Sequence, residues 1–493
     1  MEHLFNGFVI VFQPLTFAYM VLGVVGGIII GALPGMTASM GIILLLPLTY
    51  YLDPSTALIM LAGMYCGSMY GGSISAILIR TPGTPSAAAT LLDGYPLTEQ
   101  GQAGKAIGIA ALGSFAGGLF SVFCLILLAP QLAKVALKFM PADYFMLAIF
   151  GLTIMASTSG NNLIKGLISG WFGLLVATVG IDGIAGMARF TFGIPELMGG
   201  FTLVAVLIGV FAVSQVLWEV ESKKKPGEIV QQELRNTIPT IPEIKGVVLA
   251  LIIGAIIGVF IGIIPGTGGA IACFLAYNET RRWSKNKEKF GRGSYEGIAA
   301  PEAANNATTG GALVPMLSLG VPGDVVTAVM LGALMLIGIK PGPMLFVDQP
   351  HVVYALFAGL IVIQFTMLFV ALFSTRIFPY ILKVPYNILM PVVMVLCVVG
   401  AYTLQNSMFD VLVALVFGVI GYFMRKYDYP AAPLVLGVVL GPMAEENLNR
   451  ALLLSRNDWM VFIQSPISLA FLILSVVSIF LALYALRPKK ENS

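Results

Sequence analysis

Apolar runs of about 20 residues recur along the chain from Phe12 to the segment 467–486, and short polar stretches separate them. A run of this length can cross a hydrocarbon core about 30 Å thick as a helix. Lipid satisfies no backbone hydrogen bonds and the runs lack the alternation of barrel strands, so the spanning elements must be helices. The pattern predicts an all-α polytopic membrane protein with about 10–12 transmembrane segments, several of them broken or re-entrant.

Composition supports this assignment. Residues of the hydrophobic set make up 58% of the chain and charged residues only 10%, whereas a soluble chain carries about 25% charged residues. The net charge of +3 says little about partners in a chain expected to be surrounded by lipid, and no nucleic-acid partner is expected. The four cysteines stand alone in apolar stretches, so we expect them to pack as small residues: Cys66, Cys124, Cys273 and Cys397.

Glycine and proline cluster in the same order in two parts of the chain. The first part reads GALPGMTAS over 31–39, GGSIS over 71–75 and TPGTP over 81–85. The second reads GIIPGTGG over 262–269, GG at 310–311 and VPGD over 321–324. Internal repeats are a recurring construction in secondary transporters. The pattern predicts two transmembrane halves, 1–218 and 246–493, joined by a polar linker at 219–245.

Charge indicates that the two halves are inverted. The connection at 50–54 has no Lys or Arg, whereas the matching connection of the second half carries Arg281, Arg282, Lys285, Lys287, Lys289 and Arg292. By the positive-inside rule the second connection is cytoplasmic and the first lies outside. The linker, with lysines at 223–225, and the basic tail at 487–490 are also predicted to be cytoplasmic. We therefore expect a multi-pass protein of the bacterial inner membrane with a cytoplasmic C-terminus.

A Pro-Gly pair inside an apolar segment breaks a helix and frees carbonyls on one side and amides on the other. The positive start of the next helix suits a carboxylate, while freed carbonyls with Ser, Thr and Asn oxygens suit sodium. The residues expected to bind substrate are Pro34, Gly35, Thr37, Ser39, Ser73, Ser75, Arg80, Thr81, Gly83, Thr84, Gly266, Thr267, Gly268, Pro322 and Gly323. Those expected to hold a coupling ion are Glu302, Asn305, Asn306, Thr308, Thr309, Ser318 and Asp324. No catalytic residue is expected, nor any cofactor or metal other than sodium.

These choices have alternatives that the residues leave open. For the Gly, Ser and Thr residues, the alternative to binding is close helix packing, which small residues allow in any membrane bundle. Arg80 is either a partner of a substrate carboxylate or an interfacial anchor. Asp324 either binds a cation or proton or is a helix N-cap. Glu302 either carries a coupling proton or is a first-turn acid at a helix N-terminus.

At these motifs the sequence resembles the large membrane subunit of the tripartite tricarboxylate transporters, the citrate-type uptake systems of bacteria. The likeness is carried by GALPGMTASMG (31–41), YGGSISAILIRTPGTPSAAAT (70–90), IPGTGGA (264–270) and PEAANNATTGG (301–311). The resemblance implies a secondary active transporter subunit that forms the path for a tricarboxylate such as citrate, or for a related di- or aromatic carboxylate. It also implies a sodium or proton gradient as driving force, a small four-helix membrane subunit and a periplasmic solute-binding protein.

Two other classes compete with a carrier. An intramembrane enzyme is disfavoured because the only histidines, His3 and His351, lie outside the punctuated segments and leave Ser73 without a base. No G-x-x-x-x-G-K-[ST] phosphate loop occurs, which favours an ion gradient over ATP. Uphill, ion-dependent uptake would distinguish a carrier from a passive anion channel. The solute, the coupling ion and the oligomeric state are left open by the sequence.

Overall fold

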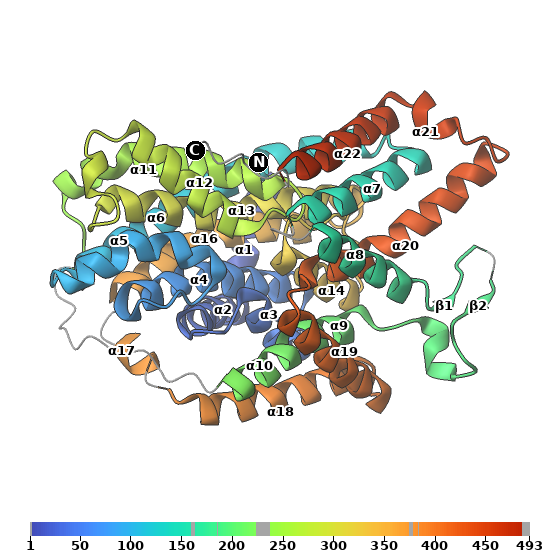
Figure 1. The fold of residues 1–493 in the computed structure, drawn as a ribbon, viewed down its shortest axis with the longest axis horizontal. Helices are drawn as coiled ribbons and strands as arrows, with labels where there is room; N and C mark the ends of the chain where they lie inside the picture. The colour runs from blue at the N-terminus through green and yellow to red at the C-terminus, as the bar shows by residue number, and fades with distance from the viewer. Residues whose placement is uncertain are drawn as a thin grey trace, which may run out of the picture. The chain divides into compact units, whose positions relative to one another are not determined.

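A computed structural model describes residues 2–158, 163–184, 186–222, 237–373, 378–382 and 384–485. The lysines of the predicted linker and the basic tail, at 223–225 and 487–490, lie outside these ranges. Most of the described residues lie in helices, and the strands among them form one two-stranded antiparallel hairpin of β1 (Gly180–Ile181) and β2 (Ala188–Arg189). Figure 1 shows this helical architecture.

The chain folds into two compact units. Unit 1 contains Met1–Ala133 and Gln215–Thr403, and unit 2 contains Lys134–Ser214 and Leu404–Ser493. Each unit takes chain from both sides of the predicted linker, so the units are not the predicted halves. The boundary at 219–245 between repeats stays a prediction.

The helices of unit 1 supply the functional site. They are α1 (Glu2–Val11), α2 (Pro14–Ala32), α3 (Ala38–Thr49), α4 (Pro54–Ile79), the 3-10 turn η1 (Pro85–Ala87), α5 (Ala88–Glu99), most of α6 (Ala103–Ala136) and α10 (Ser214–Ser222), α11 (Ile241–Ile263), α12 (Gly268–Trp283), η4 (Lys287–Lys289), α13 (Tyr295–Leu319), α14 (Val325–Leu336), α15 (Leu345–Asp348), α16 (Pro350–Phe373), α17 (Phe378–Ile381) and most of α18 (Tyr386–Gln405).

Unit 2 is a smaller helical bundle. Its elements are α7 (Pro141–Thr158), α8 (Leu163–Ala177), the β-hairpin, η2 (Pro195–Gly199), α9 (Leu203–Leu207), the π-helical η3 (Ile208–Val213), α19 (Met408–Lys426), α20 (Ala431–Leu454), α21 (Val461–Gln464) and α22 (Pro466–Ala485). Helix α20 packs on α7 and α8, and α22 packs on α7. Arg189 of the hairpin forms an ion pair with Glu445 of α20.

Eight helical segments among the described residues are long and apolar enough to cross a membrane. They are Pro14–Ala32, Pro54–Ile79, Ala103–Ala136, Leu203–Glu221, Ile241–Ile263, Pro350–Phe373, Asn387–Gln405 and Met408–Lys426. Shorter apolar helices include Ala38–Thr49 and Val325–Leu336, each of which follows a predicted break. The all-α polytopic fold is therefore confirmed, while the inversion of the repeats stays a prediction.

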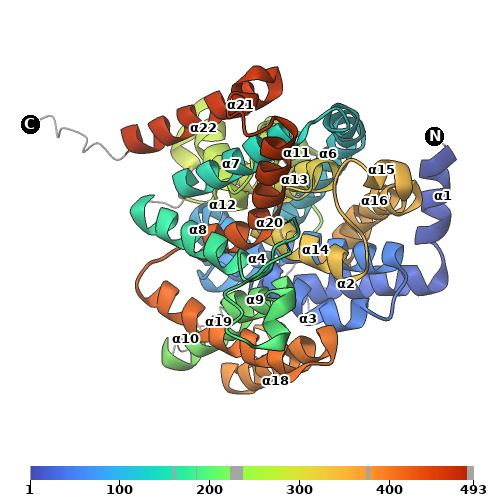
Figure 2. The same ribbon diagram turned by 90° about the vertical axis from the view of Figure 1, so that its right-hand side faces the viewer.

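Two helix pairs dominate the packing of unit 1: α2 lies on α4, and α11 lies on α13 (Figures 1 and 2). Glycines spaced four residues apart form one stripe along α2 (23, 27 and 31) and one along α11 (254, 258 and 262). A Cβ added at Gly31 would overlap the carbonyl oxygen of Ser68, and one at Gly262 would lie 2.8 Å from that of Thr308. The stripes thus allow backbone-to-backbone contact next to the Pro34 and Pro265 breaks.

Candidate functional site

All four predicted helix breaks are present. Helix α2 ends before Pro34 and α11 ends before Pro265, and α3 and α12 begin just beyond these prolines. Helix α4 ends before Pro82 and α13 ends before Pro322, and each is followed by a new helical element. At each break the proline, which supplies no amide, is followed by glycine, whereas prolines without that glycine, such as Pro301 and Pro315, stand inside a helix.

Backbone conformation at the breaks requires glycine at some positions. Gly35 has φ +87° and Gly266 has φ +79°, a region in which side chains are strained. The C-caps of α4 and α13 are also left-handed, but the first is Arg80 and the second is Gly320. Arg80 is exposed and its guanidinium carbon lies 5.5 Å from the centre of the Tyr95 ring. It therefore lies at the rim of the break rather than among its buried groups.

The breaks at Pro34 and Pro82 touch each other, and so do those at Pro265 and Pro322. A Cβ on Gly83 would overlap the carbonyl oxygen of Gly31, and the Gly83 amide donates to Gly72 O at 3.2 Å. In the second half the Gly266 amide donates to Gly323 O at 2.7 Å. Each half thus brings its own two interruptions into backbone contact.

Contacts between the halves complete a ring of breaks within unit 1. Helix α12, which follows the Pro265 break, packs on η1, which follows the Pro82 break. Helix α14, which follows the Pro322 break, packs on α3, which follows the Pro34 break. The Tyr65 hydroxyl of α4 donates to Asp324 Oδ2 at the start of α14 over 2.5 Å. Every break therefore adjoins a neighbour from its own half and one from the other half, and we call this arrangement the break ring.

Asn305 places an unpartnered oxygen beside the ring. Its Nδ2 donates to Met69 O at 3.0 Å, whereas its Oδ1 is buried without a hydrogen-bond partner among the described residues. A Cβ on Gly269 would lie 3.2 Å from Asn305 Oδ1, from Thr308 Oγ1 and from Ser86 Cβ. Two oxygens therefore border one small space next to the start of α12. A buried polar atom without a partner is costly, which indicates a ligand or water at this place.

Other predicted hydroxyl groups bond to the helix that carries them. Ser73 donates to Tyr70 O, Ser75 to Gly72 O, Thr309 to Asn306 O and Ser318 to Val314 O. Each hydroxyl oxygen keeps lone pairs that can accept a hydrogen bond or bind a cation.

The predicted polar groups at the starts of the new helices have local partners as well. Thr37 caps α3 and lies 2.9 Å from Ser39 Oγ, while Thr84 Oγ1 lies 3.2 Å from Ser86 Oγ. Thr267 donates to the carbonyls that end α11, at 2.6 Å to Ile261 O and 2.9 Å to Ile264 O. Thr81 is exposed beside Arg80.

The Pro34 break also faces a group that the sequence did not single out. A Cβ on Gly35 would lie 2.6 Å from Glu219 Oε1, which accepts from Gln215 Nε2 at 2.7 Å. Both residues belong to α10, at the edge of the predicted linker. From the sequence, Glu219 was expected only as the first residue of the polar cytoplasmic linker.

Asp324 is the N-cap of α14. Its Oδ1 accepts from the Thr327 amide at 2.8 Å and from Thr327 Oγ1 at 2.7 Å, and its Oδ2 accepts from Tyr65. The structure thus has the N-cap that was one of the two alternatives for this residue. A further role as a cation ligand stays a prediction.

Glu302 is fully buried in the middle of α13. Thr90 of α5 donates to its Oε1 at 2.5 Å and Ser114 of α6 donates to its Oε2 at 2.9 Å. The alternative that Glu302 is a first-turn acid is wrong, because α13 begins at Tyr295 with Ser294 as its N-cap. The helix runs through Pro301 instead of starting there.

The sequence did not indicate several residues of this site. Tyr65, Thr90 and Ser114 reach the predicted carboxylates from other helices, and no local pattern marks them. Gln364 is a fully buried amide in α16. Its signal was available, since it is an isolated polar residue within the apolar segment LFAGLIVIQFTMLFVALF.

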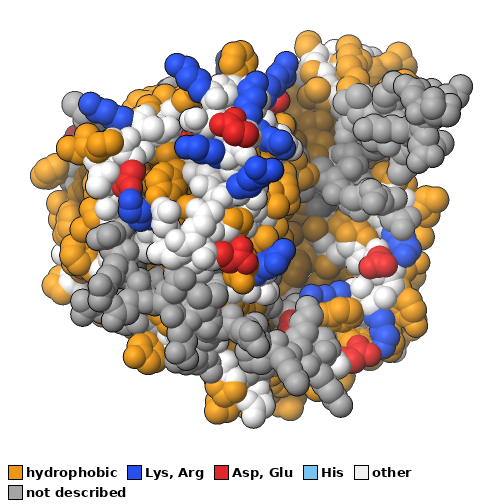
Figure 3. Space-filling model, turned by 60° about the vertical axis from the view of Figure 1, so that its left-hand side comes forward, with side chains coloured by type: hydrophobic (Ala, Val, Ile, Leu, Met, Phe, Trp, Pro, Cys, Tyr) orange, Lys and Arg blue, Asp and Glu red, His pale blue; other side chains and the backbone are white. Residues whose placement is uncertain are grey.

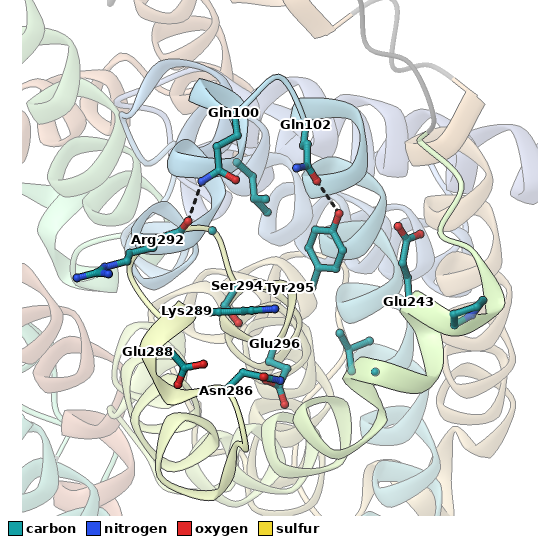
Figure 4. A pocket seen from close by; sticks show the side chains of 15 residues that line it. Gln100, Gln102, Glu243, Asn286, Glu288, Lys289, Arg292, Ser294, Tyr295 and Glu296 are labelled. Carbon is teal, nitrogen blue, oxygen red and sulfur yellow. Dashed lines mark hydrogen bonds between the residues drawn. The ribbon is translucent and has the colours of Figure 1, made fainter.

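A separate pocket of about 750 Å³ opens on unit 1 where the basic connection meets α5, α11 and the start of α13 (Figure 4). Gln100 Nε2 donates to Arg292 O at 2.8 Å and Tyr295 donates to Gln102 Oε1 at 2.8 Å. The buried Asp93 fixes the connection by accepting the amides of residues 291, 293 and 294 and the hydroxyl of Tyr277. Figure 3 shows basic side chains gathered on one face of the molecule, and the basic residues of 281–292 are all exposed.

Helix breaks that meet inside an apolar bundle, beside buried oxygens without partners, are typical of secondary transporters. The comparison with known proteins agrees with this class. The chain belongs to the Tripartite tricarboxylate transporter TctA family, which it matches over residues 17–436. The predicted resemblance is therefore confirmed, and the family is one of transporter components rather than enzymes.

Two relatives from Agrobacterium vitis are similar to this chain. The "Uncharacterized 52.8 kDa protein in TAR-I ttuC' 3'region" is 37% identical over 496 residues, which cover 99% of this chain and 97% of the relative. The "Uncharacterized protein in TAR-II ttuC' 3'region" is 37% identical over 231 residues, which cover 47% of this chain and 96% of the relative. No solved structure matches the chain.

Proposed function

We propose that this chain forms the path by which a carboxylate solute crosses the bacterial inner membrane through secondary active transport. The break ring is the observation that carries the proposal. At its breaks, backbone amides and carbonyls leave the helical ladder next to buried side-chain oxygens. Such groups bind an anion and a cation side by side without any charged side chain.

The solute in this proposal is a tricarboxylate such as citrate, or a related di- or aromatic carboxylate. Its carboxylates bind at the starts of α3 and α12, where backbone amides and the positive helix ends point, whereas the start of α14 is already capped by Asp324. Thr37 and Thr84 lie at the starts of α3 and η1 and add hydroxyl groups. Backbone recognition tolerates carboxylates of several shapes, and in this proposal the periplasmic binding protein selects among them.

The coupling ion in this proposal is sodium, held by Asn305 Oδ1 and Thr308 Oγ1 beside Gly269. Both ligands are neutral oxygens, which suits a monovalent cation whose charge is balanced by the solute. Proton coupling is the alternative, and Glu302 is its carrier because a fully buried carboxylate with two hydroxyl partners is the group best placed to bind a proton.

The proposal also includes inverted repeats and two partners. The matched glycine stripes of α2 and α11 and the matched pairs of breaks support the repeat. A small four-helix membrane subunit and a periplasmic solute-binding protein complete the three-part system that the family name describes.

Uptake by proteoliposomes that contain all three components tests the proposal. Labelled tricarboxylate is supplied outside, and sodium and pH gradients are imposed separately. We expect accumulation above the outside concentration with one of the two gradients and none without a gradient. Equilibration without accumulation would identify a passive channel, and conversion of the solute to a product would identify an enzyme.

A further inference from the structure

Gln364 of α16 is a buried amide that the break ring does not use. Its side chain is fully buried, and Oε1 has no hydrogen-bond partner among the described residues. Its Nε2 contacts Cys66 Sγ of α4 at 3.5 Å. A carbonyl oxygen left without a donor inside an apolar bundle costs free energy unless a ligand or water binds it.

Asn306 of α13 and this amide lie at the same level along α6. Glu302 contacts Ser114, and one helical turn further along each helix are Asn306 and Gly118. A Cβ on Gly118 would overlap Gln364 Oε1, so the amide of Gln364 fills the space that the missing side chain of Gly118 leaves on α6. Asn306 is itself fully buried, and neither Oδ1 nor Nδ2 has a partner among the described residues.

Thr309 and Cys66 connect the two amides. Thr309 lies one turn beyond Asn306, and its Oγ1 is 3.8 Å from Cys66 Sγ, the atom that Gln364 Nε2 also contacts. Thr309 donates its own proton to Asn306 O at 2.6 Å, so its hydroxyl oxygen presents lone pairs to the surroundings. Cys66 thus donates weakly to Thr309 Oγ1 and contacts Gln364 Nε2, while the side-chain oxygens of Asn306 and Gln364 have no donor among the described residues.

This group is distinct from the one at Asn305. Consecutive residues on a helix point about 100° apart, so Asn305 and Asn306 face different neighbours. Asn305 bonds to Met69 O and borders Gly269 of α12, whereas Glu302 and Gly310, one turn to either side of Asn306, contact α6 at Ser114 and Ser121. The two places share only the backbone of α13 between them.

We propose that Asn306, Thr309 and Gln364 form a second site for a monovalent cation, and that the cation is sodium. The ligands are two amide oxygens and one hydroxyl, which are hard and neutral and suit sodium better than a divalent ion. The inference rests on the proposed function, since it makes two sodium ions accompany one multivalent carboxylate. Two bound cations neutralise two carboxylates of the solute inside the bundle.

Equilibrium binding of radioactive sodium to the purified full-length chain tests this inference. We expect two ions bound per chain in the wild type, one in Gln364→Met and one in Asn305→Ala. Methionine keeps the length of the side chain but removes its oxygen. Gln364→Glu restores an oxygen at the same place and should retain both ions. Thr366→Val, a change on α16 outside the group, is the matched control and should also retain both.

One ion in the wild type, with no further loss in Gln364→Met, would overturn the inference. So would equal loss in Gln364→Met and Gln364→Glu, because a cation site tolerates the carboxylate whereas a packing role for the amide does not. Failure of the proposed function looks different, since tricarboxylate uptake would then show no accumulation with either gradient. Sodium-driven uptake together with unchanged binding in Gln364→Met would overturn the second site alone.

Discussion

The side-chain amide of Asn305 has one atom in a hydrogen bond and one atom without a partner among the described residues. Its Nδ2 holds α13 to the carbonyl of Met69 on α4, and its Oδ1 is left for a ligand. The first contact joins a helix of one predicted repeat to a helix of the other. A ligand bound at Oδ1 would therefore contact the side chain that links α13 to α4.

Replacing both Asn305 and Thr308 with Ala should weaken sodium dependence of uptake. If the two oxygens bind sodium, the sodium concentration for half-maximal uptake should rise roughly tenfold or more, equivalent to about 1.4 kcal/mol or more. The measurement is tricarboxylate uptake at graded sodium concentrations. Asn447→Ala, which removes an amide from α20 in unit 2, is the control. An unchanged sodium dependence would remove Asn305 and Thr308 from the site.

Replacing Tyr65 with Phe should destabilise the chain. The change removes the hydroxyl that donates to Asp324 and leaves that carboxylate oxygen buried without its donor, a loss of about 1.5–3 kcal/mol for a charged acceptor. Thermal unfolding in detergent should show a lower Tm. Tyr354→Phe keeps an aromatic ring in its stack on α16 and is the control. Equal Tm values for the two variants would show that the contact contributes nothing.

At the scale of elements, the breaks were predictable and their assembly was not. Pro34, Pro82, Pro265 and Pro322 interrupt apolar runs and are each followed by glycine, a local signal that the prolines inside helices lack. The contact of α12 with η1 and that of α14 with α3 depend on tertiary packing between segments about 200 residues or more apart in the chain. Glu302 illustrates the limit, because PEAANN reads as a helix start while the helix begins at Tyr295.

The glycine stripe of α11 gives a prediction with an internal control. A Cβ on Gly258 would lie 2.6 Å from Ala307 Cβ and overlap the carbonyl oxygen of Ala304. Gly258→Ala should therefore destabilise the chain by about 1–3 kcal/mol and lower its Tm. Gly246 lies on the same helix with nothing within 4 Å of an added Cβ, so Gly246→Ala should leave the Tm unchanged or slightly raised. Similar Tm changes in both variants would mean that helix propensity, not close packing, sets the effect.

For the whole molecule, inversion of the repeats makes a prediction about sidedness. Tyr51, in the connection after α3, and Lys285, in the connection after α12, occupy corresponding places and are both exposed. Tyr51→Cys should react with a membrane-impermeant thiol reagent added to the periplasmic side, and Lys285→Cys only after the membrane is opened. The unsubstituted chain is the control: Cys66, Cys273 and Cys397 are buried, and any labelling of the half-buried Cys124 is measured there and subtracted. Labelling of both variants from one side would rule out inversion.

The most direct test of the break ring is a cryo-EM map of the full-length chain with tricarboxylate and sodium, compared with the same preparation in choline. We predict solute density against the backbone at residues 83–84 and 266–268, with ion density at Asn305 Oδ1 that disappears in choline. Solute density in the pocket lined by Lys289 and Arg292, with nothing at the break ring, would contradict the account.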